Sequence, residues 1–180
     1  MSASGNIFLI GPMGVGKSTV GRYLAELLRM DFKDSDQEIE RRTGAGIPLI
    51  FEIEGEAGFR KRESAVIADL TATDNLVLAT GGGAILSESN RQHLHARGTV
   101  VYLYATLETL VERTRKDRHR PLLNAPDPRR KLEELMQQRG PLYQQEADLT
   151  VHTDHRNPLN VARDIVTKLK IGESHENTPS

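Results

Sequence analysis

GPMGVGKS, residues Gly11 to Ser18, is the stretch that decides how this chain folds. The five residues before it, NIFLI (6–10), are typical of a short buried strand, and a helical pattern follows it. The spacing matches G-x-x-x-x-G-K-[ST], whose glycines let the backbone turn its N–H groups inward around an anion at the positive end of a helix. The sequence therefore predicts a phosphate-binding loop between a strand and a helix.

Such a loop fits the tail of a nucleoside triphosphate. Lys17 would reach the β- and γ-phosphates, Ser18 would take one position on Mg²⁺, and Thr19 could contact the α-phosphate. A turn that binds nothing is the alternative, but it leaves unexplained a lysine whose charge opposes the helix dipole. The candidate nucleotide-binding residues of the loop are Gly14, Val15, Gly16, Lys17, Ser18 and Thr19.

The composition points to one ordinary domain. The 180 residues include 24 Lys+Arg against 25 Asp+Glu, so no charge excess favours nucleic acid or an anionic membrane as a partner. The chain has no cysteine, which excludes disulfides, thiolate metal sites and a cysteine nucleophile. Its first residues, MSASG, are too short and polar for a secretory signal, and no apolar run reaches the length of a membrane span. We expect a soluble, cytoplasmic monomer.

Short β-rich runs alternate with amphipathic stretches, which is typical of an α/β fold around a parallel sheet. The expected strands are 6–10, 31–34, 76–79, 99–104 and 149–152. The expected helices are 19–29, 38–42, 47–54, 56–70, 87–96, 107–115, 132–139 and 159–171.

Three segments of the single domain (1–180) depart from this alternation. Residues 36–70 are longer than a crossover between parallel strands requires, so they predict a substrate-binding lobe. Residues 116–130 carry three prolines and many basic residues and predict a mobile lid, in which Arg120 could reach developing charge on the phosphates. A solvated basic loop is the alternative. Residues 172–180 are polar and predict a disordered tail.

Two acidic residues lie at the end of the second expected strand. Asp34 and Asp36 are two apart, so on an extended chain both project to one side. Asp34 is the candidate that orients the water shell of Mg²⁺, and Asp36 the one that accepts hydrogen bonds from a substrate hydroxyl. A structural alternative exists, because Ser35 followed by Glu38 also fits a helix capping box.

Two further motifs suggest an acceptor pocket. Arg60 and Glu63 are neighbours on a helix surface, where the carboxylate could fix the guanidinium for a substrate carboxylate, although such pairs are usually solvated. Gly81 to Gly83 follow a strand at the carboxyl edge of the sheet and would let backbone N–H groups approach a substrate, unless they form an ordinary turn. Arg139 stands at an expected helix end, which by itself is a weak signal.

Taken together, GPMGVGKS, DSD (34–36), GFRKRE (58–63), TGGG (80–83), RHRPLL (118–123) and RGPLY (139–143) resemble the motifs of shikimate kinases in order and spacing. The resemblance spans residues 6 to about 170 and implies a three-layer P-loop fold, with a five-stranded parallel sheet flanked by helices. It implies that ATP donates its γ-phosphoryl group to the 3-hydroxyl of shikimate, with Mg²⁺ as cofactor. Gluconate-type and nucleoside-monophosphate kinases share the loop, lid and sheet and are the alternatives, as is a nucleotide-dependent switch protein.

The resemblance also implies a role for each motif residue. Those on the nucleotide and metal are Lys17, Ser18, Asp34, the lid residue Arg120, Arg113 against adenine, and Arg156 as a further nucleotide contact. Those on shikimate are Asp36 at the reacting hydroxyls, Arg60 and Arg139 at the carboxylate, Gly81 and Gly82 through their backbone, and Phe51 and Phe59 as apolar walls. The catalytic set it implies is Lys17, Asp36 and Arg120.

Overall fold

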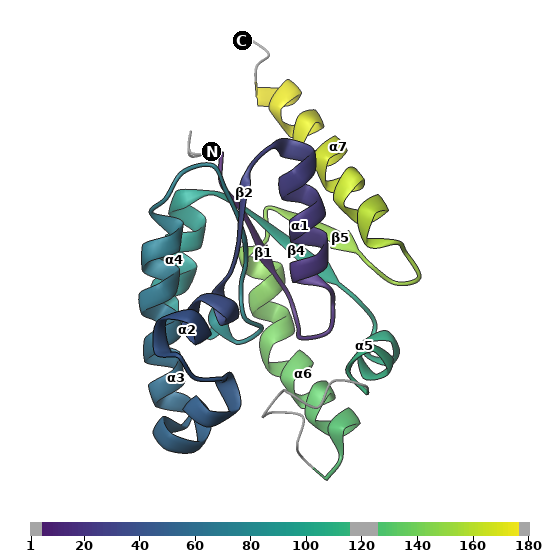
Figure 1. Ribbon diagram of the computed structural model, residues 1–180. Helices are drawn as coiled ribbons and strands as arrows, with labels where there is room; N and C mark the ends of the chain where they lie inside the picture. The colour runs from purple at the N-terminus through teal and green to yellow at the C-terminus, as the bar shows by residue number, and fades with distance from the viewer. Residues whose placement is uncertain (1–4, 116–125, 177–180) are drawn as a thin grey trace.

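The computed structural model describes residues 5–115 and 126–176, with side chains described to residue 170. Its strands are β1 (Ile7–Ile10), β2 (Asp31–Asp34), β3 (Leu76–Ala79), β4 (Thr99–Tyr104) and β5 (Leu149–His152). Its helices are α1 (Lys17–Leu28), α2 (Ser35–Thr43), α3 (Ile47–Thr71), a 3₁₀ turn (Ala84–Leu86), α4 (Glu88–Arg97), α5 (Leu107–Thr114), α6 (Pro128–Glu146) and α7 (Pro158–Glu176). Figure 1 shows helices on both sides of the sheet.

The five strands form one all-parallel sheet in the order β2-β3-β1-β4-β5. β1 lies at the centre, with Phe8 opposite Leu78 of β3 and Val100 of β4. The chain moves to one side of β1 to form β2 and β3 and then to the other side to form β4 and β5. Open α/β sheets bind ligands beyond the carboxyl ends of the strands at such a reversal. The phosphate loop follows β1 at this point, so the expected three-layer α/β fold with a five-stranded parallel sheet is confirmed.

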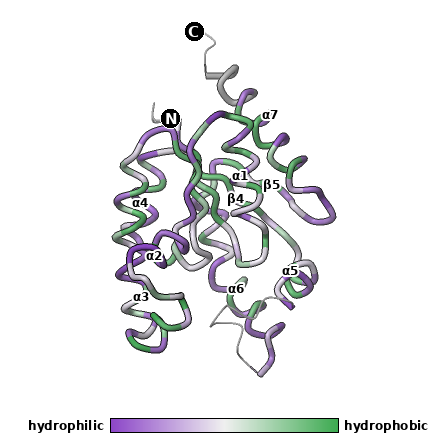
Figure 2. The backbone as a smooth tube through the Cα atoms, viewed as in Figure 1, coloured by the Kyte–Doolittle hydropathy of each residue, from purple (hydrophilic) through white to green (hydrophobic). Residues whose placement is uncertain are grey.

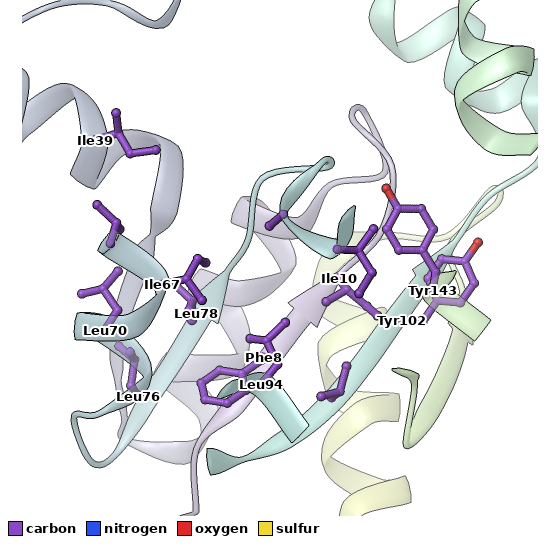
Figure 3. Packing of buried hydrophobic residues seen from close by; sticks show 14 of the residues in the cluster. Phe8, Ile10, Ile39, Ile67, Leu70, Leu76, Leu78, Leu94, Tyr102 and Tyr143 are labelled. Carbon is purple, nitrogen blue, oxygen red and sulfur yellow. The ribbon is translucent and has the colours of Figure 1, made fainter. Parts of the chain in front are cut away.

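Alternate residues of β1 pack on opposite faces of the sheet, which places a core on each side. Phe8 and Ile10 belong to the core under α3, α4 and α6, which also includes Tyr102 and Tyr143, and Figure 3 shows these rings beside Ile10. Ile7 and Leu9 belong to the core under α1 and α7. In Figure 2 the hydrophobic stretches gather where the strands run, whereas α2 is hydrophilic along most of its length. No helix in the described ranges is long and apolar enough to cross a membrane.

The expected substrate lobe consists of α2 and α3, which pack against each other. Gly55 interrupts α3 with φ 72° and ψ −179°, a left-handed conformation that favours glycine, so the two helices expected at 47–54 and 56–70 are two arms of one kinked element. Glu54 and Arg62 pair across this kink through two hydrogen bonds of 2.7 and 2.6 Å.

Helix boundaries in the carboxyl-terminal half differ from those expected. The helix predicted at 132–139 begins at Pro128, because Asp127 caps it and proline is well tolerated in a first turn, so residues 128–130 of the expected lid are helical. It also continues past Pro141 to Glu146. α7 continues to Glu176, because a single glycine costs a helix only about 1 kcal/mol, so 172–176 of the expected disordered tail are helical. Residues 116–125 and 177–180, which hold the rest of the expected lid and tail, lie outside the described residues.

Candidate active site

The phosphate loop joins β1 to α1 in the conformation that its glycines allow. Gly14 and Gly16 have φ values of 80° and 96°, which residues with a Cβ rarely adopt. Lys17 begins α1, is largely buried, and donates from Nζ to the carbonyl oxygens of Gly11 at 2.6 Å and Pro12 at 2.8 Å. The cation therefore lies folded over the loop at the positive end of α1.

The carboxylate of Asp34 contacts the next residue of the loop. Its Oδ2 accepts a hydrogen bond from the hydroxyl of Ser18, while its Oδ1 accepts from the backbone N–H groups of Asp36 at 2.9 Å and Gln37 at 3.1 Å. Asp34 is thus the N-cap of α2 and also a neighbour of the loop hydroxyl. A hydroxyl and a carboxylate are hard oxygen donors of the kind that suits a divalent ion on a triphosphate.

The alternative capping box is wrong, because Asp34 rather than Ser35 caps α2. Ser35 is fully buried and its Oγ accepts from the backbone N–H of Gly81 at 2.9 Å, which joins the start of the lobe to the loop after β3. The alternation argument for the two acids is also wrong, because Asp36 lies in the first turn of α2 and not on a strand. Asp36 lies beside the glycine turn, since a Cβ on Gly81 would lie 2.8 Å from its Oδ1.

Arg60 and Glu63 form a partly buried pair, in which the carboxylate is shielded from solvent and the guanidinium is 21% exposed. Arg60 Nη1 donates to Glu63 Oε1 at 2.9 Å, and the side chain of Glu63 is 1% exposed. Burial raises the pKa of Glu63 to about 7, against the attraction of Arg60 and with a further contribution from the charge of Asp36. Glu63 Oε2 has no hydrogen-bond partner, so the carboxyl group keeps an unused acceptor beside the glycine loop.

The three glycines are packed against these charged groups. A Cβ on Gly81 would lie 2.7 Å from Glu63 Oε2, one on Gly82 would lie 3.5 Å from Arg139 Nη1, and one on Gly83 would overlap the guanidinium of Arg60. Side chains from α2, α3 and α6 therefore meet at one backbone turn. A side chain on Gly81 or Gly83 would displace the surrounding charges, so this turn is packed against the site and is not an ordinary flexible turn.

Arg139 lies inside α6 and not at a helix end, and it is 4% exposed. It lines a small pocket between the phosphate loop and α6, together with Met13, Leu135 and Tyr143. Tyr143 is a site residue that sequence reasoning missed. Its hydroxyl donates to the carbonyl oxygen of Gly82, and burial raises its pKa. The only sequence signal was its position one helical turn after Arg139.

The remaining expected residues are spread around this centre. Phe59 is buried in the core with its ring 4.8 Å from that of the half-buried Phe51. Arg113 donates to Val15 and Thr153, and Arg156 donates to the carbonyl oxygen of His152 at 2.9 Å. Two expected site residues remain. Thr19 is exposed on the first turn of α1, and Arg120 lies outside the described residues.

A phosphate loop beside one buried and one partly buried guanidinium and two carboxylates is typical of a P-loop kinase that acts on a small acceptor. A model of the shikimate kinase family matches residues 13–170. This chain belongs to the shikimate kinase family, and it is therefore an ATP-dependent kinase that requires a divalent metal.

Relatives of known activity agree with this assignment. A shikimate kinase of Methylococcus capsulatus is 57% identical over 161 residues, which cover 89% of this chain and 90% of the relative. A shikimate kinase of Shewanella oneidensis is 54% identical over 169 residues, which cover 94% of this chain and 99% of the relative.

Solved structures show the same relationship. The shikimate kinase of Acinetobacter baumannii in complex with shikimate superposes with a TM-score of 0.92 at 50% identity, over 94% of this chain and 95% of the other. A gluconokinase of Sinorhizobium meliloti has a TM-score of 0.58 at 17% identity, over 97% of this chain and 98% of the other, and shares only the fold.

Proposed function

We propose that this enzyme transfers the γ-phosphoryl group of ATP to the 3-hydroxyl of shikimate and releases shikimate 3-phosphate and ADP, with Mg²⁺ as the metal. The observation that carries the proposal is the meeting of Arg60, Glu63, Asp36 and Arg139 at the Gly81–Gly83 turn, beside the phosphate loop. A small carboxylated polyol needs guanidiniums for its carboxylate and an acid for its hydroxyls, and this turn has both.

The nucleotide side of the site is the loop after β1. In the proposed complex the backbone N–H groups of Gly14, Val15 and Gly16 surround the phosphates, with Thr19 at the α-phosphate and Lys17 moving from the loop carbonyls to the β- and γ-phosphates. Ser18 and Asp34, whose oxygen atoms already touch, fit Mg²⁺, which neutralises phosphate charge when bound. Arg113 and Arg156 are the proposed contacts to the rest of the nucleotide.

The acceptor side is the turn between β3 and α4. In the proposed complex Arg60 and Arg139 bind the carboxylate of shikimate, and the backbone of Gly81 and Gly82 contacts its ring substituents. The Nε atoms of both arginines are buried and have no hydrogen-bond partner. Phe51 and Phe59 would supply the apolar walls, with Phe59 acting from within the core.

In the proposed reaction the 3-hydroxyl oxygen forms a bond to the γ-phosphorus, and the bond from that phosphorus to the β–γ bridging oxygen breaks. The electron pair leaves with ADP. Asp36 orients the hydroxyl and accepts its proton as the new bond forms. Lys17 and the lid residue Arg120 offset the charge that develops on the phosphoryl oxygens, so alignment and neutralisation lower most of the barrier.

The test is an ADP-release assay with shikimate, gluconate, AMP and dTMP as acceptors under identical conditions. We expect turnover that depends on shikimate and requires both ATP and Mg²⁺. Turnover with gluconate or a nucleotide, and none with shikimate, would show that the enzyme acts on another class of acceptor. ATP binding without any acceptor-stimulated turnover would instead indicate a nucleotide-dependent switch.

We also propose that the enzyme acts as a cytoplasmic monomer. The absence of cysteine from the sequence suits a reducing compartment. Light scattering across a range of concentrations tests the monomer, because a mass near twice 20.0 kDa would contradict it.

A further inference from the structure

The guanidinium of Arg113, near the end of α5, joins three segments that are far apart in the sequence. Nη1 donates to the carbonyl oxygen of Val15 at 3.1 Å and to Thr153 Oγ1 at 3.3 Å. Nη2 donates to the carbonyl oxygen of Thr153 at 3.1 Å. One side chain therefore ties α5 and the segment after β5 to the backbone of the phosphate loop.

α5 is well placed to hold this guanidinium steady. At its carboxyl-terminal end it packs against the loop so closely that a Cβ on Gly14 would lie 2.6 Å from Thr114 Cγ2. At its start, the N–H and the hydroxyl of Thr106 both donate to Asp154 Oδ1 at 3.0 Å. Thr153 is buried and donates in turn to the carbonyl oxygen of Tyr104 at 3.1 Å. Arg113 thus acts from a helix anchored at both ends.

The contact to Val15 fixes the direction of the next N–H group. The carbonyl of Val15 and the N–H of Gly16 belong to one trans peptide, so they point in opposite directions. With the carbonyl bonded to Arg113, the N–H of Gly16 points away from α5. Glycine at φ 96° has no Cβ to restrain this peptide, so an outside hydrogen bond has to do so. A cation on the carbonyl also strengthens the N–H as a donor.

We propose that Arg113 is a positioning residue for the phosphate loop, which holds the Gly16 N–H toward the polyphosphate of ATP whether or not a base is bound. The proposal rests on the proposed function, because it assumes that ATP binds in this loop. The family resemblance implies instead that Arg113 contacts adenine. If this were its only role, a different result would be expected. An adenine contact cannot affect an anion that has no base, whereas loop positioning affects any polyphosphate.

The experiment compares Mg·ATP with Mg·tripolyphosphate by calorimetric titration, without shikimate. Arg113→Lys is the main variant, because lysine keeps the positive charge but its single ammonium cannot bridge Val15 and Thr153 as the planar fork does. We expect both ligands to bind at least about threefold more weakly to Arg113→Lys, and about tenfold more weakly to Arg113→Gln. Arg163→Gln, which removes an exposed arginine of α7, is the matched control and should bind both ligands like the wild type.

A spectroscopic measurement separates loop positioning from a general loss of stability. The ¹⁵N–¹H resonance of Gly16 should shift in unliganded Arg113→Lys, because its peptide loses a charged partner, while amides of β3 and β4 stay in place. Wild-type affinity of Arg113→Lys for tripolyphosphate, with or without a loss for ATP, would overturn the proposal. So would a wild type that binds ATP but not tripolyphosphate. A wild type that binds neither ligand would contradict the proposed function itself.

Discussion

Asp34 accepts a hydrogen bond from the hydroxyl of Ser18 through one carboxylate oxygen and caps α2 through the other. The sequence offered a structural and a chemical interpretation of this acidic motif as alternatives. In the structure Asp34 takes the place of Ser35 as the cap, and its other oxygen contacts Ser18 because β2 and α1 pack against each other. The cap thus fixes the orientation of the carboxylate beside Ser18.

Asp34→Asn separates the two roles. Asparagine caps a helix about as well as aspartate, so the free energy of unfolding should stay within about 0.5 kcal/mol of the wild type, whereas Asp34→Ala should lose about 1 kcal/mol more. Turnover should fall by roughly 10² or more in both variants, because each lacks the carboxylate charge. Urea unfolding and steady-state kinetics check this. Wild-type turnover in Asp34→Asn would remove Asp34 from the metal site.

Lys17→Met tests the charge at the start of α1. Methionine fills a similar volume but cannot donate to phosphate oxygens, so kcat should fall by about 10³ or more while the fold persists. The two buried loop carbonyls that Lys17 contacts would lose their donor, so the variant should also lose some stability. Steady-state rates and the circular dichroism spectrum measure both effects. An unchanged kcat would contradict the assigned role.

Gly83→Ala should disable the acceptor pocket without affecting the nucleotide. A Cβ there would overlap the guanidinium of Arg60, and the far end of that side chain can move aside. We expect KM for shikimate to rise about tenfold or more and KM for ATP to stay unchanged. Gly140→Ala is the matched control, since a Cβ on Gly140 would meet nothing within 4 Å and alanine favours a helix by roughly 0.5–1 kcal/mol. Equal effects on both substrates would argue against the division of the site.

Tyr143→Phe removes the hydroxyl that holds the carbonyl of Gly82. The ring should stay in place, because it stacks on Tyr102 with centroids 5.1 Å apart. KM for shikimate should rise by about three- to tenfold, since the Gly82–Gly83 peptide loses its donor. Tyr104→Phe is the control, because the ring of Tyr104 also lies beside that of Tyr102. This variant should leave KM for shikimate unchanged. The same KM in all three proteins would exclude a positioning role for Tyr143.

Glu63 should make the stability of the enzyme depend on pH. Its pKa rises from 4.5 to about 7 on folding, so the folded protein holds this proton more tightly than the unfolded chain. The stability that Glu63 contributes by holding this proton is therefore present in full below pH 4.5, and it is lost as the pH rises through about 7. Glutamine in Glu63→Gln does not titrate. As the pH rises from 4.5 to about 7, the unfolding free energy of the wild type should therefore fall relative to that of Glu63→Gln, by up to roughly 3 kcal/mol.

Urea unfolding at several pH values measures this difference directly. Glu56→Gln is the matched control, because Glu56 also pairs with Arg60 but is 55% exposed. It should keep the pH dependence of the wild type. Parallel profiles for the wild type and Glu63→Gln would show that burial does not perturb Glu63.

Local sequence patterns predicted much of the fold. The strands at 31–34, 76–79, 99–104 and 149–152 have the predicted bounds, and the last three are short β-rich runs. Helix ends were harder to predict. Pro128 lay in the expected lid, and the expected helix ended before Pro141. In the structure Asp127 caps α6 and Tyr143 packs in the core, so α6 includes both prolines.

The sequence by itself determined the phosphate loop, the parallel α/β arrangement and the family, because each motif or element is a short local pattern and the family follows from the order of these motifs. Only the tertiary structure decided how the other motifs come together. It brought Asp36, Arg60 and Arg139 to one glycine turn, buried Glu63 enough to raise its pKa, and placed Arg113 on the backbone of the phosphate loop. These properties depend on burial and on contacts between distant segments, which no local pattern of residues contains.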